Sequence, residues 1–278
     1  MSPLLFVIVV AAISVVAGFL GALLGLGGGI IIVPTLTLLL GVDIRLAIGA
    51  SIVSVIATSS GAAAAYVRDR MANIRVAMFL ELGTAAGAIT GAYLAGILNP
   101  RFLFILFGLI LAYSAFAMLR GRRSAEQEIE AGPWARVLKL KSSYFDDAVG
   151  EEIVYQPVRA RIGLALMYFA GVISGLLGIG SGSLKVPAMD LAMELPIKVS
   201  TATSNFMIGV TAAASAGVYF SRGQIDPFIA GPVAIGVMGG AFIGSHTLGR
   251  ISSRSVRFTF VVVLTIIAAQ MLFKGVTA

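Results

Sequence analysis

Two stretches of sequence decide the fold: "LGLGGGIIIVP" at residues 24–34 and "LGIGSGSLKVP" at residues 177–187. Both lie within long apolar sequence, yet both are rich in glycine, which costs about 1 kcal/mol per residue relative to alanine inside a helix. Several glycines so close together indicate that a helix is interrupted there. The same interruption occurs twice, and this repetition organises the rest of the chain.

The composition around these stretches is that of a membrane protein. The chain is 58% hydrophobic and 12% charged, whereas a soluble domain is roughly 25% charged. Apolar runs near the ~20 residues that cross a bilayer as a helix recur along nearly the whole chain. We therefore predict an all-α, multi-pass protein of the cell membrane that contacts lipid. The first run has no basic residue before it and exceeds a signal-peptide core, so we expect it to be retained.

Several kinds of function are disfavoured by residue content. The chain has no cysteine and a single histidine, His246, which excludes disulfides, thiolate metal sites and multi-histidine metal centres. We expect no cofactor and no metal. The net charge of +7 comes from bases in loops, where they set topology and contact anionic lipid rather than nucleic acid.

The chain contains two copies of one unit. Residues 17–119 align with residues 170–272 without a gap, and the matched positions include glycines and prolines of the two stretches. We predict a first repeat over 1–119, a polar connector over 120–161 and a second repeat over 162–278. Each repeat has five apolar segments, at 3–24, 30–41, 46–67, 76–98 and 102–119, and at 162–178, 183–195, 199–220, 228–249 and 258–273.

The orientation of the repeats depends on how many segments cross the membrane. The connector carries eight Lys and Arg residues, which favours the cytoplasm. If all five segments cross, the repeats are inverted; if 30–41 and 183–195 only dip in and return, four cross and fewer bases lie inside. We predict inverted repeats with both termini outside, and a short hairpin in the connector around residues 151–158.

The glycine-rich breaks predict the site. A helix over 30–41 would rise about 18 Å, too short for a ~30 Å hydrocarbon core. Unwound backbone at membrane depth is tolerated where it is buried in protein or lines a wet cavity. Interrupted segments at corresponding positions of inverted repeats point to a transporter's binding site, so we expect the two breaks to meet near the membrane midplane and form that site. Close helix packing alone is the alternative. The predicted substrate-binding residues of the breaks are Gly25, Gly27, Gly28, Gly29, Pro34, Gly178, Gly180, Ser181, Gly182 and Pro187.

The residues in and near the breaks also indicate the charge of the ligand that this site would bind. Neither break contains an acid, and the second adds Lys185. Exposed backbone N–H groups, the positive end of a half-helix and one ammonium group suit an anion. Snorkelling or a structural ion pair is the alternative for Lys185. Glu81 is a candidate for a coupling proton or for pairing with a base.

Hydroxyl and amide groups add further candidates. Ser204 and Asn205 are expected to donate to an anionic substrate, and Ser51 and Thr58 are weaker candidates, because such groups often only join helices. Glycines recur every fourth residue in two ladders, which predicts close helix packing. These ladders are Gly83, Gly87 and Gly91, and Gly236, Gly240 and Gly244.

The paired "GLGGGIIIVP" and "GIGSGSLKVP" resemble the TauE/SafE family of membrane transporters over nearly the whole chain apart from the connector. The resemblance implies transport of small sulfur-containing anions such as sulfite and sulfonates. The residues that match are Gly25, Gly27, Gly29, Pro34, Gly178, Gly180, Gly182 and Pro187, and the second copy departs from the first at Ser181 and Lys185.

The function predicted from these observations is secondary transport of a small anion by alternating access between the two repeats. No nucleotide-binding motif is present, so the substrate gradient or a coupling proton or sodium ion would drive transport. An anion channel with the same site is the first alternative, and an intramembrane enzyme is the second. A homo-oligomer is compatible with the sequence.

Overall fold

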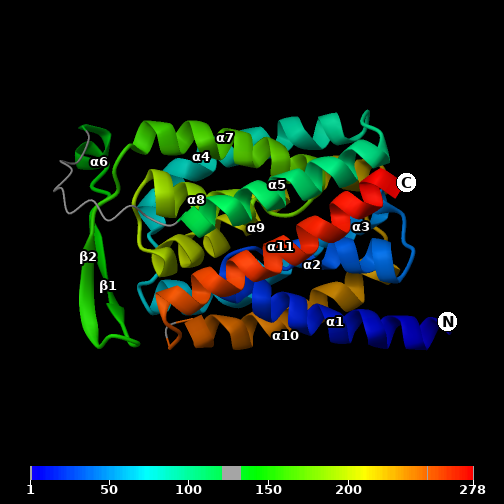
Figure 1. Cartoon of the computed structure of the whole chain (residues 1–278), viewed down its shortest axis with the longest axis horizontal. Coiled ribbons are helices and arrows are strands. Elements are labelled where there is room, and N and C mark those ends of the chain that lie inside the picture. Colours follow the sequence, from blue (N-terminus) through cyan, green and yellow to red (C-terminus); the bar gives the residue numbers. More distant parts are fainter. Residues whose placement is uncertain (1, 121–132, 249, 278) are drawn as a thin grey trace.

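The computed structural model describes residues 2–120, 133–248 and 250–277, and nearly all of its elements are helices (Figure 1). The first half contains α1 (Pro3–Leu24), α2 (Gly29–Pro34), the π-helical turn η1 (Thr35–Leu39), α3 (Ile44–Arg68), α4 (Ile74–Ala95) and α5 (Pro100–Arg120). The second contains α7 (Ala160–Leu177), α8 (Gly182–Pro187), the π-helical turn η2 (Ala188–Ala192), α9 (Ile197–Ser221), α10 (Pro227–Leu248) and α11 (Ser253–Thr277).

The long helices identify an integral membrane protein. Seven of the described helices are long and apolar enough to cross a bilayer. The eighth long helix, α9, has a more polar sequence, and its hydroxyl and amide side chains are almost all buried. Packing against α3 and α4 encloses this polar surface inside the bundle, so α9 can lie at membrane depth without exposing it to lipid.

The two halves interlock through the predicted glycine ladders. Helix α1 packs along α10, and α4 packs along α7. A methyl group added at Gly87 would overlap the carbonyl oxygen of Tyr168, and one at Gly240 would overlap that of Val15. Glycine lets the helix backbones approach this closely, which confirms the packing role of the ladders.

Both termini lie at one end of the bundle, and the connector lies at the other (Figure 1). Helix α1 runs toward the connector end, whereas its counterpart α7 begins beside the connector and runs the opposite way. These directions support the inverted orientation of the repeats.

The connector forms a small cap at its end of the bundle. Helix α6 (Pro133–Val137) is followed by an antiparallel hairpin of β1 (Ser142–Asp146) and β2 (Glu151–Tyr155). The connector thus contains a hairpin, but the hairpin begins earlier than predicted, and the stretch 151–158 supplies only its second strand. Residues 121–132 of the predicted connector lie outside the described residues.

Candidate functional site

The two glycine-rich breaks meet at the centre of the bundle. Gly27 and Gly180 both lie against Val55 of α3 and Ile208 of α9, and these helix residues correspond to each other in the two repeats. A methyl group at Gly182 would overlap the carbonyl oxygen of Gly25. The breaks are buried and in direct contact, as the sequence predicted.

Backbone conformation explains why glycine is needed in the breaks. Gly25, Gly27 and Gly28 have φ values of 72°, 80° and 64°, and Gly178 and Gly180 have 65° and 75°. Residues other than glycine rarely adopt this left-handed region. Ser181, which takes the place of Gly28 in the second half, nevertheless has φ 58°.

Each break is followed by a half-helix of similar form. Gly29 and Gly182 begin the short helices α2 and α8, and the buried Pro34 and Pro187 end them at the junction with a π-helical turn. The interruption therefore places a short helical segment in contact with the long helix that precedes it.

Serine hydroxyls join each break to the opposite repeat. Ser51 of α3 donates a 2.6 Å hydrogen bond to the carbonyl oxygen of Gly178. Ser204 of α9 donates a 2.8 Å bond to the carbonyl oxygen of Gly25. Because Ser51 and Ser204 occupy equivalent positions in the repeats, each half bonds the break of the other half in the same way.

The other two predicted polar site residues, Asn205 and Thr58, differ in whether they bond to the region of the breaks. The Asn205 side-chain amide donates to the Ala22 carbonyl oxygen, three residues before the first break. Thr58 donates to the Ser54 carbonyl oxygen of its own helix, although its hydroxyl flanks Gly28. Asn205 is thus part of the central bonding, whereas Thr58 only borders it.

Sequence reasoning missed one pair of tyrosines. Tyr66 donates a 2.9 Å bond to the Ala22 carbonyl oxygen, and its counterpart Tyr219 donates a 2.6 Å bond to that of Gly175. Both tyrosines therefore hold the end of the helix that precedes a break. Their alignment between the repeats was the signal that could have found them.

Several buried polar atoms near the breaks have no hydrogen-bond partner in the described part of the chain. They are Ser54 Oγ, Ser183 Oγ, Ser200 Oγ, Thr201 Oγ1 and Asn205 Oδ1. A buried polar atom without a partner is costly, so such atoms in a native protein call for an explanation. Four of the five are hydroxyls that can donate to an anionic oxygen.

Lys185 and Glu81 form a buried ion pair. Lys185 is fully buried and Glu81 is 8% exposed. The Lys185 Nζ lies 3.4 Å from Glu81 Oε2 and donates a 2.6 Å bond to Thr211 Oγ1. Thr211 in turn donates a 2.6 Å bond to Glu81 Oε1, and Thr84 donates a 2.8 Å bond to Glu81 Oε2.

This polar cluster joins α4 of the first half to α8 and α9 of the second, and most of its repeat-related positions are apolar. The positions equivalent to Lys185, Glu81 and Thr84 are the apolar residues Ile32, Ala234 and Val237. Thr58 and Thr211 are equivalent, but only Thr211 joins the cluster. The cluster therefore departs from the twofold repeat that the glycine-rich stretches follow. The sequence predicted Lys185 and Glu81 as site residues, but it did not predict that they pair with each other or that Thr84 and Thr211 join them.

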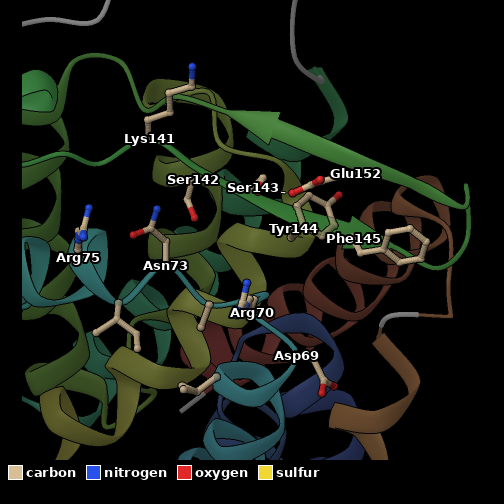
Figure 2. A pocket seen from close by; sticks show the side chains of 13 residues that line it. Asp69, Arg70, Asn73, Arg75, Lys141, Ser142, Ser143, Tyr144, Phe145 and Glu152 are labelled. Atoms are coloured by element: carbon tan, nitrogen blue, oxygen red, sulfur yellow. Dashed lines mark hydrogen bonds between the residues drawn. The ribbon is translucent and has the colours of Figure 1, made fainter.

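Polar contacts attach the connector hairpin to its end of the bundle. Lys198, in the first turn of α9, is fully buried and lies 2.6 Å from Asp146 of β1. Asn73 donates from its side chain to the Leu140 carbonyl oxygen and from its backbone to Thr203 of α9. A cavity of about 520 Å³ opens beside Asn73, between Arg70 and strand β1 (Figure 2).

The surroundings of the Asp146 carboxyl shift its pKa. Burial disfavours its charged form, but hydrogen bonds from Lys198, the Ala148 amide and Tyr144, together with the Lys198 charge, lower the Asp146 pKa below its usual value. Burial raises the pKa of the adjacent Tyr144. An ionised Asp146 therefore attaches the hairpin to α9 at neutral pH.

Metal-binding chemistry is not indicated in the described residues, where no group of three or more His, Cys, Asp or Glu side chains could hold an ion.

A membrane-embedded bundle with two broken helices in contact at its centre defines a membrane transport protein. The family model of the sulfite exporter TauE/SafE matches residues 10–271, so the chain belongs to this family. The resemblance seen in the glycine-rich stretches is thereby confirmed.

Curated relatives carry the corresponding names. The chain is 29% identical to the probable membrane transporter protein YunE of Bacillus subtilis, over 97% of this chain and 98% of the relative. It is 27% identical to YdhB of the same organism, over 87% and 89% of the two chains. A probable membrane transporter protein of Xylella fastidiosa is 28% identical, over 85% and 82%. No solved structure matches this chain.

Proposed function

We propose that the protein is a secondary transporter that moves a small anion across the cell membrane by alternating access between its two repeats. The observation that carries the proposal is the reciprocal contact of the two breaks, in which Ser51 bonds Gly178 and Ser204 bonds Gly25. Any relative movement of the halves must change these contacts. A substrate bound between the breaks would contact both repeats, so its binding could change their relative position.

The anion would be held by donors that already surround the breaks. Lys185 provides the positive charge, and the unpartnered hydroxyls of Ser54 and Ser183 provide hydrogen bonds. These groups suit the oxygens of a sulfite or sulfonate group. The family's name supports a sulfur-containing anion. Oxyanions without sulfur are the competing substrates.

The orientation follows from the loop charges. The connector, rich in Lys and Arg, would face the cytoplasm, and both termini would lie outside. The buried breaks then correspond to a closed conformation, from which the two sides open alternately. An anion channel using the same groups is the second candidate function.

Transport by purified protein in liposomes tests the proposal. Labelled sulfite or ethanesulfonate outside should accumulate transiently in liposomes preloaded with the unlabelled anion. Lys185→Met should abolish this counterflow, whereas Lys274→Met, at the end of α11, should retain it. Flux without saturation or counterflow would indicate a channel. Uptake of a cation in place of the anions would refute the anionic site.

A further inference from the structure

The Glu81–Lys185 pair poses a problem of charge if an anion is to bind. Lys185 is buried and already faces one carboxylate at 3.4 Å, with Thr211 bridging both groups. A second negative charge beside Glu81 would meet strong like-charge repulsion at low dielectric. Removing the carboxylate without replacement would leave Lys185 as an unpaired buried charge.

We propose that the substrate anion replaces the Glu81 carboxylate at Lys185 and that Glu81 takes up one proton as it does so. The inference rests on the proposed transport function and specifies its coupling. The ion pair becomes a pair of Lys185 and the substrate anion, beside a neutral Glu81 carboxyl. A monovalent anion and one proton enter together, so the net charge of the site does not change.

The geometry favours such an exchange. Thr211 accepts from Lys185 and donates to Glu81, so its hydroxyl proton can turn to an anion that takes the place of the Glu81 oxygen. Thr84 contacts Glu81 through one hydroxyl, which can donate to a carboxylate or accept from a protonated carboxyl. Both protonation states of Glu81 therefore find a partner.

The other charged and titratable groups near Glu81 are engaged elsewhere. Helix α4 packs against α7 and α9, and Lys185 comes from α8. The other charged and titratable side chains of these helices each contact a different partner. The pairs are Arg75 with the Lys139 carbonyl oxygen, Tyr93 with Arg222, Arg161 with the Trp134 ring, Tyr168 with the Phe169 ring, Lys198 with Asp146, and Tyr219 with the Gly175 carbonyl oxygen. Glu81 is thus the carboxyl that opposes Lys185.

The asymmetry of the cluster gives the exchange a single location. The position equivalent to Lys185 is Ile32 in the first half, and the position equivalent to Glu81 is Ala234 in the second, so the repeat-related place in the bundle has neither the base nor the carboxyl. One substrate anion and one proton per cycle follow from one cluster.

Calorimetry can count the proton directly. Ethanesulfonate is the probe because it does not titrate near neutral pH, and binding is measured in Tris and in bis-tris, which contain no competing sulfonate. The difference in binding enthalpy between the two buffers gives the number of protons taken up. We expect one proton per anion and a Kd that rises up to tenfold per pH unit above neutral.

Variants separate the inference from the proposed function. Glu81→Gln should still bind ethanesulfonate, with no proton uptake and no pH dependence, while Glu194→Gln, whose carboxyl faces Arg159, should keep the wild-type proton. If Glu81→Gln does not fold, the wild-type proton count decides alone. Binding with zero protons overturns the coupling and leaves the transport proposal standing; absence of binding overturns both for sulfonates.

Discussion

Ser204 donates a 2.8 Å hydrogen bond to the carbonyl oxygen of Gly25, and this bond crosses from the second half of the chain into the first. The interruption of a helix leaves backbone groups without their usual partners, and buried groups of this kind must be satisfied. Each half of the molecule supplies the hydroxyl that the other half needs. Neither repeat is therefore complete by itself.

Replacing Ser204 by alanine should lower stability, because the buried Gly25 carbonyl would lose its partner. The expected loss is about 1–3 kcal/mol, measured as a lower Tm in detergent. Ser60→Ala is the control, since Ser60 is exposed and bonds only within its own helix; it should change stability by less than about 0.5 kcal/mol. Equal effects of the two variants would contradict the role of Ser204.

Gly182→Ala should disrupt the contact between the breaks. Its added methyl group would overlap the Gly25 carbonyl oxygen, so the two halves would have to move apart, and both Tm and anion counterflow should fall. Gly217→Ala in α9 meets no atom within 4 Å, and alanine favours a helix by about 1 kcal/mol. That control should be neutral or stabilising. A tolerated Gly182→Ala would mean that the breaks do not need their close approach.

The buried ion pair should show strong thermodynamic coupling. Glu81→Leu alone leaves Lys185 charged and unpaired, which is expected to cost about 3–5 kcal/mol. Adding Lys185→Met removes that charge and should recover much of the loss. A double-mutant cycle of unfolding free energies measures the coupling. Additive losses from the two substitutions would show that the side chains do not depend on each other.

The sequence predicted the bounds of the helical segments better than the contacts between them. The apolar runs and the glycines at residues 25 and 178 locate the helix ends within a few residues, because these signals are local. Ser204 and Ser51 were predicted as donors to the anion, but not as the hydroxyls that bond the carbonyl oxygens of the opposite break. The pairing of Glu81 with Lys185 joins positions 104 residues apart, and a single sequence carries no information on which helix faces which.

The attachment of the hairpin was also beyond sequence reasoning. Lys198 begins α9 and Asp146 ends β1, so their contact depends on where the connector folds back. Local pattern predicted a hairpin, but not the polar contacts that join it to the bundle. Those contacts lead to a prediction that depends on pH.

Asp146→Asn should weaken the attachment of the hairpin at neutral pH and not at low pH. The folded-state pKa of Asp146 is lowered, so folding favours the charged form, and the stabilisation is fully present above the carboxyl's usual pKa of about 3.9. It is lost as the pH falls through the lowered folded-state value. The Tm difference between wild type and Asp146→Asn should therefore be constant from about pH 7 to pH 5 and shrink at lower pH.

The matched control for this prediction is Asp69→Asn. Asp69 pairs with Arg68 on the surface, where both side chains are exposed, and such pairs contribute little. Its Tm should follow that of wild type across the whole pH range. If Asp146→Asn also follows wild type at neutral pH, the Lys198 contact does not hold the hairpin, and the cap must be retained by Asn73 and its bonds to Leu140 and Tyr155.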